Sequence, residues 1–248
     1  MRKNKLILIM VCAGLISGAI MAMNTEVTIR QGINGRVREI RMPLYIKAME
    51  FLSRNYEYQR IAKEITKGCI TEEEKALAIL AWTHENIKPV PQGMPVVDDH
   101  ILNIIIRGYG AIDQSQDVFA NLCTYAGLPA FYTRAYAGDH RVYYPLSFVK
   151  IGGKWRVFDP YNNVYFRTKD GAIAGVEDIM ADRSLIEKCR IADQSYGQVR
   201  YKEFYYNLKP VTRSSMLRSE EQMPLKRAVF EIKKALGIEK KGPVAQEG

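Results

Sequence analysis

The sequence predicts an α+β fold in which helices come first and an antiparallel sheet follows. Apolar residues recur at helical spacing over residues 43–67, 71–87 and 113–126. Beyond Pro129 the pattern changes to β-branched and aromatic runs, at 131–137, 146–151 and 154–158. Gly152 and Gly153 separate the last two runs and are typical of a two-residue hairpin turn. This order argues against alternating βαβ units and a parallel sheet.

The individual helices have recognisable ends. Gly68 ends the first helix, and Thr71 followed by Glu74 forms a capping box that begins the second. Gly127 and Pro129 end the third helix. A short apolar run at 101–106 lies between the second and third helices, and 164–166 is β-like; 175–190 and 196–206 are expected to be helical.

The composition excludes several classes of protein. Of 248 residues, 47% are hydrophobic and 25% charged, which is ordinary for a globular chain and excludes disorder throughout. The net charge is +9, but residues 1–5 contribute +3 and residues 209–241 contribute +5. Because the middle of the chain is nearly neutral, we expect no nucleic acid as a partner.

The N-terminus is typical of an exported protein. Three basic residues in 1–5 precede an uncharged run of eighteen residues, Leu6–Met23. An A-x-A cleavage pattern is absent, because Ile20 lies two residues before Ala22. We therefore expect residues 1–23 to be an uncleaved signal anchor that inserts in a membrane through residues 6–23, with the rest of the chain extracytoplasmic. The alternative is a signal peptide that is cleaved, so that the protein is secreted.

The remaining organisation is simple. Residues 24–42 are polar and contain Gly32 and Gly35, which favours a linker. A domain is expected over 43–210 and a basic C-terminal helix and tail over 211–248. Leu225, Val229, Ile232 and Leu236 form an apolar stripe in this tail, beside Lys226, Arg227, Lys233 and Lys234. Such an amphipathic helix either packs on the domain or lies on anionic lipid or a partner.

Three segments together resemble one known family. Residues 110–130 (GAIDQSQDVFANLCTYAGLPA) are similar to the nucleophile helix of the transglutaminase-like superfamily, which has a papain-like fold. Residues 152–160 (GGKWRVFDP) resemble its hairpin that ends in Trp-x-x-x-Asp-Pro, and the helix with Ala81-Trp82 and Asn86-Ile87 resembles its preceding helix. The resemblance covers residues 71–166, within a domain of 43–210.

The resemblance implies a Cys–His–Asp triad, but only one of the three positions is retained. In the family, a Cys at a helix N-terminus is activated by a His that an Asp orients, and acyl transfer or amide hydrolysis follows. Counted from 127–130, the nucleophile position falls on Ile112, which has no nucleophilic atom. The His position falls on Tyr144, a poor base with an ordinary pKa near 10. The Asp position is Asp159. No catalytic residue set is therefore intact.

Other residues near these positions are candidates for secondary roles. His140 lies four residues before Tyr144 and is the candidate substitute for the missing His. Asp113 is expected to cap the third helix. A binding cleft is expected near Asp113, Gln114, Trp155 and Asp159, although Trp155 also fits a core position and Asp159 a turn.

Two functions of different classes follow. The first is a non-catalytic, pseudoenzyme-like domain at the outer face of a membrane that binds a peptide, a glycan or a protein partner. The alternative is a cysteine-dependent acyl transferase, amidase or protease with relocated residues, using Cys69 or Cys123 with His100 or His140. A further route without a nucleophile would use Asp113, His140 and Asp159 as acid or base.

No cofactor is expected, and no metal site. The three histidines, His84, His100 and His140, are far apart, and neither C-x-x-C nor H-E-x-x-H occurs. Outside the predicted anchor the cysteines are Cys69, Cys123 and Cys189, so at least one is unpaired within the chain. Cys123 lies about three helical turns beyond Ile112 among apolar neighbours, which favours a buried structural role.

Overall fold

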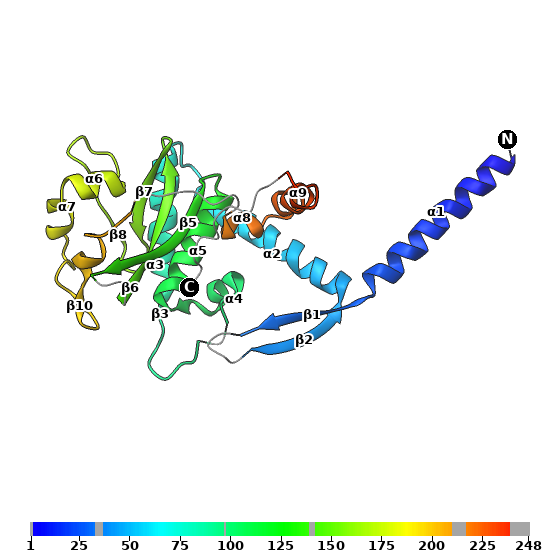
Figure 1. Cartoon of the computed structure of the whole chain (residues 1–248), viewed down its shortest axis with the longest axis horizontal. Coiled ribbons are helices and arrows are strands. Elements are labelled where there is room, and N and C mark those ends of the chain that lie inside the picture. The colour runs from blue at the N-terminus through cyan, green and yellow to red at the C-terminus, as the bar shows by residue number, and fades with distance from the viewer. Residues whose placement is uncertain (1, 33–36, 97, 139–141, 210–216, 239–248) are drawn as a thin grey trace. The chain divides into compact units, whose positions relative to one another are not determined.

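The structure of the protein is a computed structural model that describes residues 2–32, 37–96, 98–138, 142–209 and 217–238 (Figure 1). Within these ranges the side chains of residues 2–6, 8, 30 and 31 are not described. The chain divides into two compact units, Met1–Arg54 and Asn55–Gly248. Helix α2 (Leu44–Ile65) contributes residues to both units.

The first unit contains a helix and a hairpin. Helix α1 (Arg2–Met23) is followed by strands β1 (Glu26–Gln31) and β2 (Arg38–Pro43), which pair antiparallel. The segment expected to be a linker, 24–42, therefore holds regular structure. The hairpin forms because apolar residues alternate with polar ones along both strands. In the paired strands, Val27 lies opposite Met42 and Ile29 lies opposite Ile40.

No helix in the described part of the chain is long and apolar enough to span a bilayer. The side chains of Leu6 and Leu8, which belong to the predicted span, lie outside the described residues.

The helices of the second unit build its first hydrophobic core. Helix α3 (Glu72–Asn86) begins with the predicted capping box: the Thr71 hydroxyl accepts from the Glu74 N–H at 3.1 Å, and the Glu74 carboxylate accepts from the Thr71 N–H at 3.0 Å. Helices α4 (Ile101–Arg107) and α5 (Ile112–Tyr125) follow. Short strands β3 (Lys88–Pro89) and β4 (Tyr109–Gly110) pair in parallel before α5.

The sheet confirms the α+β prediction. Strands β5 (Ala130–Ala137), β6 (Val142–Ile151), β7 (Lys154–Asp159) and β8 (Val164–Tyr165) form one antiparallel sheet in that order. Gly152 and Gly153 adopt φ of +57° and +80°, which suits a tight hairpin turn between β6 and β7.

Alternation along β6 divides the interior into two cores. Val149 faces the first core, with α3, α4 and α5, whereas Leu146 and Phe148 face the second. The second core lies under the irregular segments that follow the sheet. Since Tyr144 has the same parity as Leu146, its side chain also points into the second core.

The segment after the sheet departs from the expectation of two helices. Residues 175–190 form two short helices, α6 (Val176–Ala181) and α7 (Ser184–Glu187). The predicted helix over 196–206 is wrong: the segment holds β9 (Ser195–Tyr196), β10 (Val199–Arg200) and a 3-10 turn, η1 (Tyr201–Phe204). Gly197 turns the chain with φ +64°, which breaks a helix there.

The second unit extends beyond the predicted boundary at residue 210. In α8 (Arg218–Glu221), the Ser219 hydroxyl donates to the Ala130 carbonyl at 2.9 Å and accepts from the Thr124 hydroxyl at 2.7 Å. Arg218 pairs with Asp117 of α5 at 3.0 Å. Helix α9 (Pro224–Ala235) follows, and none of its side chains is buried.

Candidate functional site

The end of β7 holds a fully buried carboxylate, Asp159, whose oxygens are surrounded by donors. One oxygen, Oδ2, accepts from the Tyr201 hydroxyl at 2.7 Å, the Asn162 amide at 2.8 Å and the Tyr144 hydroxyl at 3.0 Å. The other, Oδ1, accepts from the Gln116 side chain at 3.0 Å and from two backbone N–H groups, of Tyr161 at 3.1 Å and Asn162 at 3.4 Å. With six donors the carboxylate is saturated, so it orders its neighbours rather than accepting a substrate proton.

Burial and hydrogen bonding act on Asp159 in opposite directions. Loss of solvent around the carboxyl raises its pKa, while the bonds from Asn162, Tyr201 and Tyr144 lower the pKa. Burial dominates, and the pKa of Asp159 is raised above its ordinary value.

Tyr144 occupies the position that the resemblance gives to the triad His, and it contacts Asp159 directly. Its hydroxyl donates to the carboxylate and accepts from the Asn162 amide at 2.7 Å. Burial and the neighbouring Asp159 carboxylate raise the pKa of Tyr144. The phenol therefore stays neutral at physiological pH, and it holds its proton toward Asp159 instead of accepting one from a nucleophile.

A group of tyrosines surrounds this pair and was not predicted from the sequence. The rings of Tyr196 and Tyr201 meet Tyr144 edge-on, with centroids 4.9 Å and 5.5 Å away. Tyr201 also exchanges a hydrogen bond of 2.6 Å with Tyr205, and because the Tyr201 proton is directed at Asp159, Tyr205 is the donor. The aromatic run at 201–206 lies in a segment that the sequence predicts to be helical. Spacing along the chain does not reveal that Tyr201 contacts Asp159, forty-two residues earlier.

Ile112 is the first residue of α5, as the alignment with the nucleophile helix requires. The preceding Ala111 has extended backbone and acts as N-cap residue. Ile112 is half-buried and packs against the second core, to which Tyr144 belongs. The position therefore contributes apolar packing, and the side chain offers no atom for covalent catalysis.

Asp113 does not cap α5 in the predicted way. It lies one residue inside the helix, where its carboxylate accepts from the N–H of Gln114 at 3.0 Å. Desolvation, followed by the nearby Asp99, raises the pKa of Asp113.

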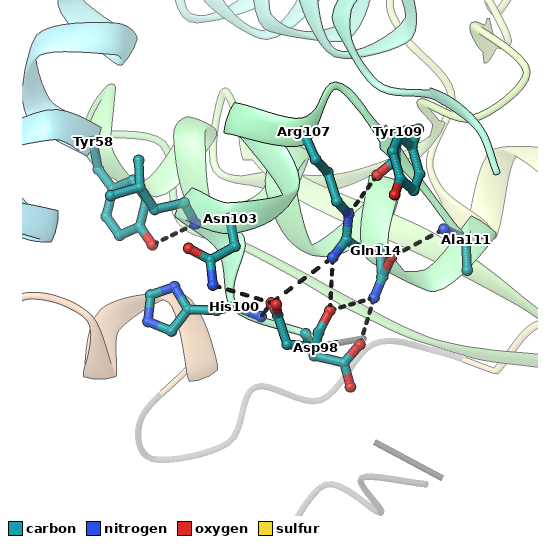
Figure 2. Close-up of polar contacts among 10 residues, drawn as sticks. Tyr58, Asp98, His100, Asn103, Arg107, Tyr109, Ala111 and Gln114 are labelled. Carbon is teal, nitrogen blue, oxygen red and sulfur yellow. Dashed lines mark hydrogen bonds and ion pairs between the residues drawn. The ribbon is translucent and has the colours of Figure 1, made fainter. Parts of the chain in front are cut away.

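Gln114 holds the loop before α4 against the start of α5 (Figure 2). Its carbonyl oxygen accepts from Arg107 at 2.6 Å and from the Ala111 N–H at 3.1 Å. Its amide nitrogen donates to Asp99 at 2.6 Å and to the Asp98 carbonyl at 3.0 Å. Since each of these positions is used within the protein, Gln114 acts as a positioning residue, and the binding cleft expected near it stays a prediction.

Arg107 completes the same network. Its guanidinium donates to the Tyr109 carbonyl at 2.8 Å and to the Asp98 carbonyl at 3.2 Å. Asn103 donates to the Asp98 carboxylate at 3.3 Å (Figure 2). These bonds attach α4 to the turn that precedes α5.

Trp155 lies in the packing of the sheet. It is half-buried, and its ring meets Phe131 edge-on at 5.0 Å against the second core. This arrangement favours the core interpretation over a substrate platform.

Of the three histidines, His84 contacts the turn after Asp159, His100 lies before α4, and His140 is outside the described residues. The Nδ1 atom of His84 is 3.0 Å from the Tyr161 carbonyl, which ties α3 to the turn after Asp159. His100 precedes α4, and its backbone N–H donates to Asp98 at 2.9 Å (Figure 2). His140 is outside the described residues, so its candidacy as a substitute stays a prediction.

The cysteines do not offer an activated thiol at the start of α5. Cys12, Cys69, Cys123 and Cys189 are free thiols. Cys123 is fully buried, and burial raises the pKa of its thiol, which opposes formation of the nucleophilic thiolate. Cys189 packs at the edge of the second core. Within the described part of the chain, no group of three or more His, Cys, Asp or Glu side chains is arranged to hold a metal ion.

Comparison with known proteins gives matches to solved structures. No family model matches the sequence, and no curated protein matches it. A protein assigned as a cysteine protease from Cytophaga hutchinsonii is 21% identical over 44% of this chain and 38% of its own, with a TM-score of 0.39. A protein assigned as a protease from Parabacteroides distasonis is 15% identical over 55% of this chain and 36% of its own, with a TM-score of 0.35. A TGase is 12% identical over 54% of this chain and 43% of its own, with a TM-score of 0.33.

The three structures are described as a cysteine protease, a protease and a TGase, which are kinds of protein that the sequence resemblance names. This chain spans about two fifths of the length of each matched structure. Because the TM-scores are below 0.5, the roles given to individual residues depend on the contacts of this chain alone.

Proposed function

We propose that this protein is an exported, membrane-anchored transglutaminase-like domain that binds a peptide, glycan or protein partner without covalent catalysis. The observation that carries the proposal is the hydrogen bond from Tyr144 to Asp159. These residues stand where the resembled family has its catalytic His and Asp, and a Tyr–Asp pair cannot take a proton from a nucleophile and pass it on.

The nucleophile position supports the same conclusion. Ile112 begins α5, where the family places a thiol, and contributes only packing. Cys123 does not replace the missing nucleophile. It is buried eleven residues further along the chain, and burial raises the pKa of its thiol. Activation by a relocated thiol would thus require Cys69 or Cys189.

Membrane anchoring rests on the sequence of residues 1–23. The basic start and the uncharged run Leu6–Met23 are typical of a signal anchor, which would hold the domain on the extracytoplasmic side.

Mapping of thiol reactivity tests the non-catalytic proposal. The full chain is treated with limiting iodoacetamide across a pH series, and the labelled cysteine is identified by mass spectrometry. We expect slow labelling at Cys69 and Cys189 at neutral and acidic pH, and no labelling of the buried Cys123. Rapid labelling of one cysteine well below pH ~8.5, the pKa of a free thiol, would identify an acidified nucleophile and overturn the proposal in favour of a cysteine enzyme.

A further inference from the structure

Helix α9 presents an apolar stripe to solvent. The stripe consists of Leu225, Val229, Ile232 and Leu236, which are 82%, 52%, 58% and 67% exposed. A helix with this much exposed apolar surface in one line usually has a partner.

The less exposed part of α9 is on another side of the helix. Phe230 is half-buried, and it lies five residues from Leu225, about 140° around the helix axis. Lys226, in the first turn, pairs with Glu220 of α8 at 3.1 Å. The apolar stripe lies on the exposed side of α9.

Charge identifies the kind of partner. Residues 224–235 contain four basic side chains and one acidic one, Glu231. Lys233 falls about 80° from Leu225, at the border of the stripe, while Ala228 and Ala235 border its other side. Lys226 lies about 100° from Leu225 but is paired with Glu220, so Lys233 is the border cation that a headgroup would meet. Long basic side chains at this border can extend toward phosphate groups while the stripe enters the acyl region.

We propose that α9 is an interfacial helix that lies on an anionic lipid surface, with its stripe in the acyl boundary. A second copy of the chain fits less well. In an antiparallel symmetric contact through the stripe, the lysine borders of both copies would lie on the same side, and like charges at an apolar contact repel. A lipid surface with negative headgroups instead compensates these charges.

Hydrogen–deuterium exchange of the full chain tests this inference. The protein is measured free, with phosphatidylcholine vesicles, and with vesicles that also contain phosphatidylglycerol. We expect amides of residues 224–236 to exchange more slowly only with phosphatidylglycerol present. Exchange in residues 6–23 reports the N-terminal anchor separately, so a failure of anchoring and a failure of this proposal are distinguishable.

Two sets of variants separate the apolar and the ionic contributions. Leu225→Gln with Ile232→Gln should abolish the protection, and because both side chains are exposed the fold should persist, which circular dichroism checks. Lys233→Gln with Lys234→Gln should weaken binding to the anionic vesicles at least about fivefold, which is the effect of Lys233 at the border of the stripe, since Lys234 lies about 180° from Leu225. Lys154→Gln with Lys169→Gln removes the same charge from exposed positions outside α9 and should leave binding unchanged.

Three results would overturn the proposal. The first is equal exchange of α9 with both kinds of vesicle, and the second is loss of binding in the control pair as large as in the α9 pair. The third is protection of α9 in the free protein that disappears on dilution, because it would show that a second copy covers the stripe.

Discussion

The Asp159 cluster and helix α9 differ in what they leave exposed to solvent: the polar groups of the cluster are buried and bonded to one another, whereas α9 exposes its apolar side chains. Around Asp159, six donors saturate one buried carboxylate, and aromatic rings close over it. In α9, large apolar side chains stay exposed, and Lys226 of the first turn pairs with Glu220 of α8. A closed cluster stabilises a fold, whereas an open amphipathic face is available to a partner. The contrast assigns stability to the Asp159 cluster, and it is the basis for our proposal that α9 binds a lipid surface.

Asp159→Ala should have the largest effect on stability. It leaves several buried donors without an acceptor, and since each costs about 1–3 kcal/mol, we expect the free energy of unfolding to fall by about 4 kcal/mol or more. Urea denaturation measures the change. A loss near that of an exposed substitution would show that the cluster is open to solvent.

Gly175→Ala should follow in size. A Cβ at Gly175 would lie 2.4 Å from the Trp155 carbonyl oxygen, although the backbone there, with φ −98°, is open to alanine. The segment at Gly175 and strand β7 must then move apart, at a cost of about 1–3 kcal/mol in the free energy of unfolding. Thermal unfolding tests this, and an unchanged midpoint would contradict the close approach.

Tyr144→Phe should cost less, about 1–2 kcal/mol, because it removes one donor to Asp159 and one acceptor for Asn162 while it keeps the ring. Tyr143→Phe is the matched control on the same strand, since Tyr143 is 46% exposed. If both variants lose equal stability in urea, the hydrogen bond to Asp159 contributes nothing.

The smallest expected effect is a pH dependence. The pKa of Asp159 is raised in the folded state, so the folded protein holds this proton more tightly than the unfolded chain. Its contribution to stability is therefore present below the unfolded pKa of about 3.9 and is lost as pH rises through the folded value. The stability of Asp159→Asn minus that of the wild type should increase with pH over this window. A decrease would mean that the hydrogen bonds, and not burial, dominate.

Local signals predicted the parts of the fold that depend on neighbouring residues. The Thr71–Glu74 capping box and the Gly152–Gly153 turn lie where the sequence places them. The helix expected over 196–206 failed because Gly197 turns the chain with a positive φ, and because Tyr201 contacts Asp159, which is distant in sequence. The hairpin in 24–42 was missed because its glycines suggested a linker, although Val27, Ile29, Ile40 and Met42 carried the strand alternation.

Only part of the candidate site could be predicted, because most of its contacts join residues that are far apart in the sequence. The resemblance singled out Tyr144 and Asp159, and the structure joins these two side chains by a hydrogen bond, while their role as a site stays a prediction. Gln116, Asn162 and Tyr201 complete the shell around Asp159, and nothing in their spacing identifies them.

Restoration of the missing chemistry tests the central claim most directly, namely that Ile112, Tyr144 and Asp159 keep the places of a triad without its function. The variant Ile112→Cys introduces a thiol at the start of α5, and its rate of alkylation is measured against pH in three backgrounds: wild type, Tyr144→Phe and Tyr144→His. The account predicts that only Tyr144→His shifts the alkylation profile to lower pH, because an imidazolium beside the thiolate lowers the thiol pKa. Identical profiles in folded variants of all three backgrounds would contradict it, since position 144 would then not face the start of α5.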